Sequence, residues 1–147
     1  MIYFICRGWG ICMLLDELKL GRSFLDMDYG IVSYIQDNTY HIIEFSGVDE
    51  PFKKGDSFPL NMVYCSVVYY SRELFGVHNI QNPEGRKLHP LYENIKLNAY
   101  IGLPIYKDNQ VYGTLNFSSK EVREEPFSSS QISFLKDTAL LIENKLP

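Results

Sequence analysis

The clearest pattern in the sequence is an alternation of side-chain character between residues 98 and 119. One set of alternate positions is apolar or small and comprises Ala99, Ile101, Leu103, Ile105, Val111, Gly113, Leu115 and Phe117. The other set is mainly aromatic and polar and comprises Tyr100, Gly102, Pro104, Tyr106, Tyr112, Thr114 and Asn116. Because successive side chains of a strand point to opposite faces, the pattern predicts two strands whose faces differ chemically.

A polar turn over residues 107–109 joins these two strands. Matching like faces predicts a three-residue loop that pairs Ile105 with Val111 and Tyr100 with Asn116. Asn109 would end this loop, because asparagine tolerates a left-handed backbone. The aliphatic face is suited to packing against helices. The face of Tyr, Thr and Asn either lines a pocket or is half-exposed to solvent, and the pattern is compatible with both.

Helical patterns occur at both ends of the chain. Apolar residues at helical spacing from Ile11 to Leu18 predict an amphipathic helix over about residues 11–25. Near the other end, Ser128 and Gln131 have the spacing of a capping box, with Phe127 placed to pack onto Ile132. The core-facing stripe of this last helix comprises Ile132, Leu135, Ala139 and Ile142, widened by Phe134 and Leu141.

The segments between these elements are less regular. β-branched and aromatic residues predict strands over 29–36 and 40–46, joined by a turn at Asp37 and Asn38. Residues 47–59 are predicted as a surface loop, 61–73 as one or two short helices, and 74–80 as a strand. A loop over 81–88 and a short helix beginning at His89 and Pro90 precede the alternating segment.

This order of elements predicts an α+β fold: a central antiparallel sheet with the N- and C-terminal helices on one face. The length of 147 residues fits one domain, which we place at residues 11–147 after an irregular apolar lead over residues 1–10. Arg7, Gly8 and Gly10 interrupt that lead well short of the ~20 residues that a membrane span requires. No membrane interaction is therefore expected.

Composition and charge exclude several classes of function. The net charge is −4, and basic residues form no run longer than the pairs Lys53-Lys54 and Arg86-Lys87, so no nucleic-acid partner is expected. Three cysteines without regular spacing do not suggest a disulfide framework and fit a cytoplasmic location. The three histidines, His41, His78 and His89, follow no metal-ligand spacing. No catalytic carboxylate pair, Ser-His-Asp set or phosphate-binding loop is recognisable, so neither a metal site nor an enzyme is predicted.

Several short motifs occur in an order that resembles a GAF domain. The second half of such a domain is matched by Tyr100-Ile101-Gly102-Leu103-Pro104, by Tyr112-Gly113-Thr114-Leu115-Asn116-Phe117, and by Pro126-Phe127-Ser128 before the last helix. Upstream, the same pattern is matched by Leu20-Gly21-Arg22 ahead of Gly30, by Tyr64-Cys65-Ser66, and by His89-Pro90 with Tyr92. The resemblance covers roughly residues 11–146. It is strongest to GAF modules of bacterial sensor histidine kinases and cyclases.

This resemblance implies a ligand pocket on the sheet face opposite the terminal helices. It also implies that those helices form a homodimer and pass a signal to an output domain such as a kinase or cyclase. The expected function is a cytoplasmic small-molecule-sensing regulatory domain of a bacterial signal-transduction system, such as a two-component system. The ligand-binding candidates are Tyr100, Tyr112, Thr114 and Asn116 on the sheet, with Tyr64, Cys65 and His78 from the covering segments.

Two alternatives remain beside this expectation. One is a ligand-free dimerisation module, in which the aromatic side chains fill a closed pocket. The other is a thiol-based free methionine sulfoxide reductase, an activity that the resemblance includes. Cys6 and Cys12 lie at the start of the chain, ahead of the segments that would cover the pocket, which leaves Cys65 without a resolving partner near the pocket. No cofactor is predicted, and Ser66 argues against a covalent bilin at Cys65, because His typically follows the attachment cysteine in bilin-binding relatives.

Overall fold

The computed structural model describes residues 14–80 and 97–146, and the sequence-based expectations for residues 1–13 and 81–96 lie outside them. The helices are α2 (Leu14–Leu25), the 3₁₀ turn η1 (Leu60–Met62), α3 (Cys65–Ser71) and α5 (Ser129–Lys145). The strands are β1 (Tyr29–Gln36), β2 (Thr39–Gly47), β3 (Ser57–Pro59), β4 (Phe75–Val77), β5 (Ala99–Lys107) and β6 (Gln110–Ser119).

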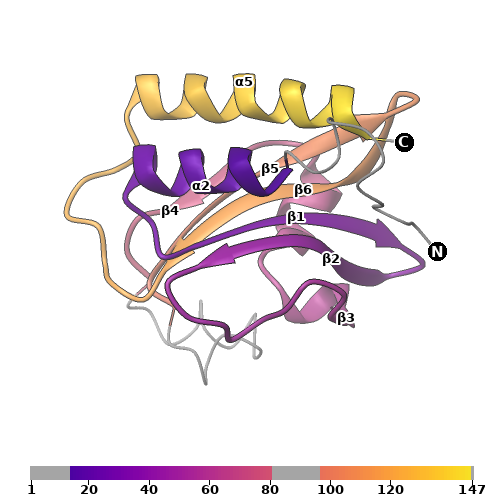
Figure 1. Cartoon of the computed structure of the whole chain (residues 1–147), viewed down its shortest axis with the longest axis horizontal. Coiled ribbons are helices and arrows are strands. Elements are labelled where there is room, and N and C mark those ends of the chain that lie inside the picture. Colours follow the sequence, from indigo (N-terminus) through magenta and orange to yellow (C-terminus); the bar gives the residue numbers. More distant parts are fainter. Residues whose placement is uncertain (1–13, 81–96, 147) are drawn as a thin grey trace.

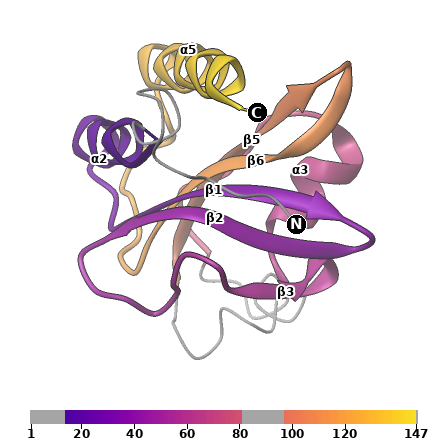
Figure 2. The ribbon, with the colours of Figure 1, turned by 45° about the vertical axis from the view of Figure 1, so that its right-hand side comes forward.

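The six described strands form one antiparallel sheet in the order β3-β2-β1-β6-β5-β4. Helices α2 and α5 lie side by side on one face of this sheet (Figure 1). The short helix α3 packs on strands β5 and β6 from the opposite face (Figure 2). The predicted α+β fold, with both terminal helices on one face, is therefore confirmed. Within the described residues, no helix is both long and apolar enough to cross a bilayer.

The sheet separates two hydrophobic cores. The helix-side core joins α2 and α5 to the sheet and includes Leu18, Leu115, Phe117, Leu135 and Ile142. The core on the other face, here called the aromatic core, includes Tyr29, Tyr40, Phe52, Tyr64 and Tyr100 together with aliphatic residues such as Val68. The two faces expected from the alternation in residues 98–119 thus pack against different partners.

The terminal helices run antiparallel. An ion pair of 2.9 Å joins Glu17 at the start of α2 to Lys145 at the end of α5, and the rings of Phe24 and Phe134 stack with centroids 4.3 Å apart. The capping box of α5 is present: Gln131 N donates to Ser128 Oγ at 3.2 Å, and Ser128 N donates to Gln131 Oε1 at 2.9 Å. It orients the first turn of α5 by satisfying two backbone N–H groups.

The α5 stripe was predicted too wide. Leu135, Ala139 and Ile142 are buried and Ile132 packs against the same core, as expected. Leu141 was expected to widen this stripe but is 50% exposed, because it lies on the side of α5 that faces away from the sheet.

The register predicted for the β5–β6 hairpin is wrong. The chain turns through Asp108 and Asn109 alone, with φ values of 53° and 63°, so that Lys107 pairs with Gln110. Two consecutive positive φ values are typical of a tight two-residue hairpin turn. Two residue pairs beyond the turn, the register shifts because Tyr112 has no partner in β5, and Ile105 then pairs with Gly113. Beyond this bulge, apolar positions of β5 again pair with apolar positions of β6, such as Leu103 with Leu115. The predicted three-residue loop had been chosen to give the same match.

Two other segments differ from the sequence-based expectation, and a third agrees with it. The predicted loop over residues 47–59 contains β3, which pairs with β2, and a buried Phe52. The strand expected over residues 74–80 is confined to Phe75–Val77. The segment expected to hold one or two helices contains η1 and α3. The predicted first hairpin is confirmed, with a register shift between Val32 and Ser33.

Candidate functional site

A set of buried polar side chains lies at the centre of the sheet, on the face opposite α2 and α5. It is called here the central polar cluster, and its members come from β1, β2, α3, β5 and β6. No member is more than 2% exposed; they are Ser33, Tyr40, Cys65, Tyr100, Thr114 and Asn116. Polar groups this deeply buried are costly unless they are hydrogen-bonded, so the cluster requires internal partners.

Asn116 is the hub of the cluster. Its Nδ2 lies 3.1 Å from Tyr40 Oη, 3.2 Å from Cys65 Sγ and 3.1 Å from Thr114 Oγ1. An amide nitrogen has two protons to donate, so these three acceptors compete for them. Cys65 Sγ also lies 3.1 Å from Tyr100 Oη, which extends the cluster from the sheet centre to β5. The hydrogen bonds can therefore be rearranged without moving the side chains far.

Ser33 joins the cluster to β1. Its Oγ lies 2.7 Å from Thr114 Oγ1 and accepts a 3.0 Å hydrogen bond from Thr114 N. These contacts form where the neighbouring residue, Gly113, brings its backbone against β1: a Cβ built on Gly113 would lie 1.8 Å from the carbonyl oxygen of Ser33. The absence of a side chain at residue 113 thus allows the close approach at the centre of the sheet.

Burial sets the chemistry of the thiol. Desolvation raises the pKa of Cys65 above its ordinary value, and hydrogen bonds with Thr114, Tyr100 and Tyr40 oppose this rise only in part. The thiol is therefore protonated at neutral pH, which makes it a weak nucleophile. Its position is that of a hydrogen-bonding member of the core rather than of an activated cysteine.

Aromatic rings border the cluster. The ring centroid of Tyr100 lies 5.4 Å from that of Tyr64 and 6.1 Å from that of Phe75. Among the described residues, no acidic or basic side chain belongs to the cluster, and no group of three or more metal-ligating side chains occurs. The cluster thus consists of uncharged donors and acceptors that bond to one another and are framed by aromatic rings. Groups of this kind suit a polar, uncharged and planar partner.

Five of the seven predicted site residues lie together on this face of the sheet. They are Tyr64, Cys65, Tyr100, Thr114 and Asn116, and all five are buried. His78 does not join them: it lies one residue beyond β4, where its backbone carbonyl accepts a 2.8 Å hydrogen bond from Arg123 N.

The predicted position of Tyr112 is wrong. The bulge turns this side chain to the helix-side core, where its ring lies 4.8 Å from that of Tyr34. Its buried hydroxyl has no hydrogen-bond partner among the residues that the structure describes, and desolvation raises its pKa. The alternation in the sequence assigned Tyr112 to the other face because it contains no signal for the extra residue.

Sequence reasoning missed two members of the cluster, Ser33 and Tyr40. Ser33 is an isolated small polar residue in an otherwise apolar and aromatic strand, and it shares a face with Tyr29, Ile31 and Ile35. A buried hydroxyl in such a strand requires a partner. That requirement was a usable signal, but it could not identify Thr114 as the partner without the β1–β6 pairing.

Comparisons with known proteins agree with this architecture. The family model of the GAF domain matches residues 13–146. The fold is similar to the GAF domain of phosphoenolpyruvate-protein phosphotransferase from Acinetobacter, with 16% identity, a TM-score of 0.71, and coverage of 90% of this chain and 78% of the other. A search of curated proteins found no match.

Two further solved structures show the range of proteins with this fold. The blue-light absorbing form of the PixJ GAF domain from Thermosynechococcus elongatus is 16% identical, with a TM-score of 0.68 and coverage of 90% and 84%. Free methionine-R-sulfoxide reductase from Neisseria meningitidis, in complex with its substrate, is 14% identical, with a TM-score of 0.70 and coverage of 91% and 75%. At these identities the similarity establishes the fold alone.

Proposed function

Because the chain belongs to the GAF domain family, we propose that it is a small-molecule-sensing regulatory domain of a bacterial signal-transduction system. The central polar cluster is the observation that supports this most directly. It places uncharged hydrogen-bonding groups, framed by aromatic rings, on the face of the sheet opposite the terminal helices. A ligand that hydrogen-bonds to Asn116 or Tyr100 would favour one arrangement of this cluster and so shift the population of states.

The terminal helices are the proposed route of the signal and the proposed homodimer contact. Four large apolar side chains on them are about half exposed or more: Leu20 (60%), Phe24 (48%), Leu140 (59%) and Leu141 (50%). Exposed apolar residues gathered on two neighbouring helices are typical of a protein–protein contact. A second copy of the chain would bury them, and an output domain such as a kinase or cyclase would receive the change.

A ligand-free dimerisation module is the second candidate, because the same exposed apolar residues support it without any ligand. A thiol-based methionine sulfoxide reductase is supported less well. The raised pKa of Cys65 disfavours the thiolate that such chemistry uses, and Cys65 is the one cysteine within the described residues.

The proposed sensing role is tested by asking what the protein binds. The protein is purified from cells, and its mass and absorbance are measured in native and denaturing conditions. We expect a co-purifying compound, or a stabilising compound in a thermal-shift panel of purines, aromatic metabolites and tetrapyrroles. Retention of the compound should be lost in Asn116→Ala and Tyr100→Phe but kept in Tyr112→Phe, which changes a hydroxyl on the other face. Bare protein that no compound stabilises would contradict the sensing role.

The proposed homodimer is tested by solution mass. Light scattering after size exclusion should give the mass of a dimer for the parent chain and of a monomer for Leu140→Asp combined with Leu141→Asp. Ser133→Asp, at an exposed polar position of α5, serves as the matched control and should remain dimeric. A monomeric parent would contradict both the homodimer and the ligand-free module.

A further inference from the structure

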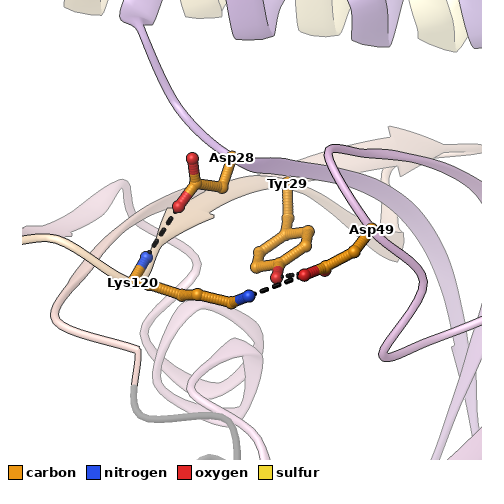
Figure 3. A network of polar contacts seen from close by, with 4 residues as sticks. All are labelled: Asp28, Tyr29, Asp49 and Lys120. Atoms are coloured by element: carbon orange, nitrogen blue, oxygen red, sulfur yellow. Dashed lines mark hydrogen bonds and ion pairs between the residues drawn. The ribbon is translucent and has the colours of Figure 1, made fainter.

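A network of polar contacts joins three segments that are distant in sequence: the turn before β1, the loop after β2 and the connector after β6 (Figure 3). The ammonium of Lys120 lies 2.6 Å from Asp49 Oδ2. The backbone N–H of the same lysine donates to Asp28 Oδ2 at 3.0 Å, and Asp28 N donates to Ser119 Oγ at 3.0 Å. Lys120 therefore contacts the other two segments through different groups.

Tyr29 links this network to the aromatic core. Its ring is fully buried in that core, while its hydroxyl donates to Asp49 Oδ1 (Figure 3). The ammonium of Lys120 lies 5.8 Å from the centroid of the same ring. Hydrogen bonds from Lys120 and Tyr29 lower the pKa of Asp49, so its carboxylate is ionised at neutral pH and able to hold both partners.

The loop that carries Asp49, residues 48–56, is packed onto the aromatic core. Phe52 is 3% exposed, and its ring centroid lies 6.3 Å from that of Phe45 and 5.8 Å from that of Phe58. At its far end, Gly55 N donates to the carbonyl of Ile42 at 2.8 Å. The position of this loop therefore depends on how the aromatic core is packed.

The connector that carries Lys120, residues 120–128, is fixed to both terminal helices. Arg123 Nη1 donates to the carbonyl oxygen of Leu25 at the end of α2, at 2.7 Å. Arg123 Nη2 lies 3.3 Å from Oε1 of Gln131, the same oxygen that completes the capping box of α5. A displacement of the connector therefore acts on the last turn of α2 and on the first turn of α5.

We propose that the contact between Lys120 and Asp49 couples the loop over residues 48–56 to the terminal helices. When the aromatic core repacks and the loop moves, the connector loses its contact with Asp49 and the first turn of α5 loosens. This coupling rests on the proposed function only in that a ligand at the central polar cluster would be the natural cause of such repacking. Through this contact, loss of order in residues 48–56 lowers the order of the connector and of the first turn of α5, without a defined shift of either segment.

Hydrogen exchange of the full chain without any ligand tests the coupling. Lys120→Met removes the ammonium but keeps the backbone bond to Asp28, and Asp49→Asn removes the charge of its partner. In both variants we expect exchange to accelerate about two- to fivefold in residues 48–56 and also in residues 120–131, which include the first turn of α5. Lys54→Met is the matched control: it removes the 3.3 Å ion pair with Glu44 from the same loop and should leave residues 120–131 unchanged.

Three outcomes would overturn the coupling. Exchange could accelerate in residues 48–56 while residues 120–131 exchange as slowly as in the Lys54→Met control. That result would show that the contact acts only on its own loop. Unchanged exchange in both segments would show that the contact does not restrain them. Equal acceleration throughout β1 and β2 would show global destabilisation instead. The measurement needs no ligand, so its failure is distinct from a failure of the proposed sensing role.

Discussion

Arg123 donates a hydrogen bond of 2.7 Å from Nη1 to the carbonyl oxygen of Leu25, a residue 98 positions earlier in the chain. The guanidinium also lies over the ring of Phe127, 4.4 Å from its centroid. One partly buried side chain thereby connects the end of α2 to the start of α5. The planar guanidinium can donate to a carbonyl and stack on a ring at once.

Arg123→Lys should therefore destabilise the fold. A lysine keeps the charge but loses the second donor and the stacking surface, so we expect a loss of about 1 to 3 kcal/mol in the free energy of unfolding by urea. Lys136→Met, at an exposed position of α5, serves as the control and should change stability by less than about 0.5 kcal/mol. Equal effects of the two substitutions would contradict the structural role of Arg123.

Gly113 and Gly76 form a matched pair of strand glycines with opposite expectations. Gly113→Ala would place a methyl group 1.8 Å from the carbonyl oxygen of Ser33, whereas the nearest atom to a methyl group at Gly76 lies 3.4 Å away. Since the first clash is with backbone, we expect Gly113→Ala to cost about 3 kcal/mol or more of stability, and Gly76→Ala to change it by less than about 1 kcal/mol. Chemical denaturation of both variants checks this. Similar denaturation midpoints for the two variants would show that the backbone of β1 can move away at Ser33 and relieve the clash.

Tyr112→Phe should leave the protein at least as stable as the parent. The hydroxyl is buried without a partner among the described residues, so its removal should raise the free energy of unfolding by up to about 1 kcal/mol. The same substitution on Tyr40, whose hydroxyl accepts from Asn116 Nδ2 at 3.1 Å, should lower it instead. A loss of stability in Tyr112→Phe would mean that this hydroxyl has a partner in solution.

Tyr112 should also affect stability at alkaline pH. Burial raises the pKa of its hydroxyl above the ordinary value of 10.0, so the folded state holds this proton more tightly than the unfolded chain. This group leaves the free energy of unfolding unchanged with pH below pH 10 and lowers it as the pH rises from 10 through the folded-state pKa, because the unfolded chain loses the proton first. The melting temperature of Tyr112→Phe should therefore fall less steeply than that of the parent as the pH rises above 10. If the melting temperatures of the parent and of Tyr112→Phe fell in parallel with pH, the raised pKa of Tyr112 would be contradicted.

Cys65 should react slowly with thiol reagents in the folded protein. It is fully buried and its pKa is raised, so both access and ionisation disfavour attack. In a Cys6→Ser, Cys12→Ser background, we expect labelling by a chromogenic disulfide to be at least about a hundredfold slower than in denaturant. Rapid labelling of the folded protein would instead support the thiol-enzyme alternative.

The elements that sequence reasoning located are those specified by neighbouring residues. The capping box of Ser128 and Gln131 needs only three residues of local chain, and the alternation around Leu115 is a property of single strands. Both are visible without knowledge of the fold. The two sheet faces and the terminal helices could therefore be predicted from the sequence.

The features that sequence reasoning missed depend on contacts between distant residues. The bulge at Tyr112 is specified by the pairing of β5 with β6, and Ser33 meets Thr114 across 81 positions of sequence. The sequence around Arg123 is that of a polar connector, and nothing in it indicates that this side chain binds the carbonyl of Leu25 at the end of α2. Tyr100, Thr114 and Asn116 were found because they share a strand face, whereas the register that joins them to the other members was not predicted.

The antiparallel pairing of α2 and α5 (Figure 1) places the start of one helix beside the end of the other. The ion pair between Glu17 and Lys145 joins these two ends. A short flexible linker from Leu146 to Leu14 should therefore close the described fold into a ring, and new termini could be opened at the exposed turn of Asp108 and Asn109. Such a circular permutant would keep every layer of the structure while tying the end of α5 to the start of α2. It would separate what the helices contribute to stability from what they contribute to signalling.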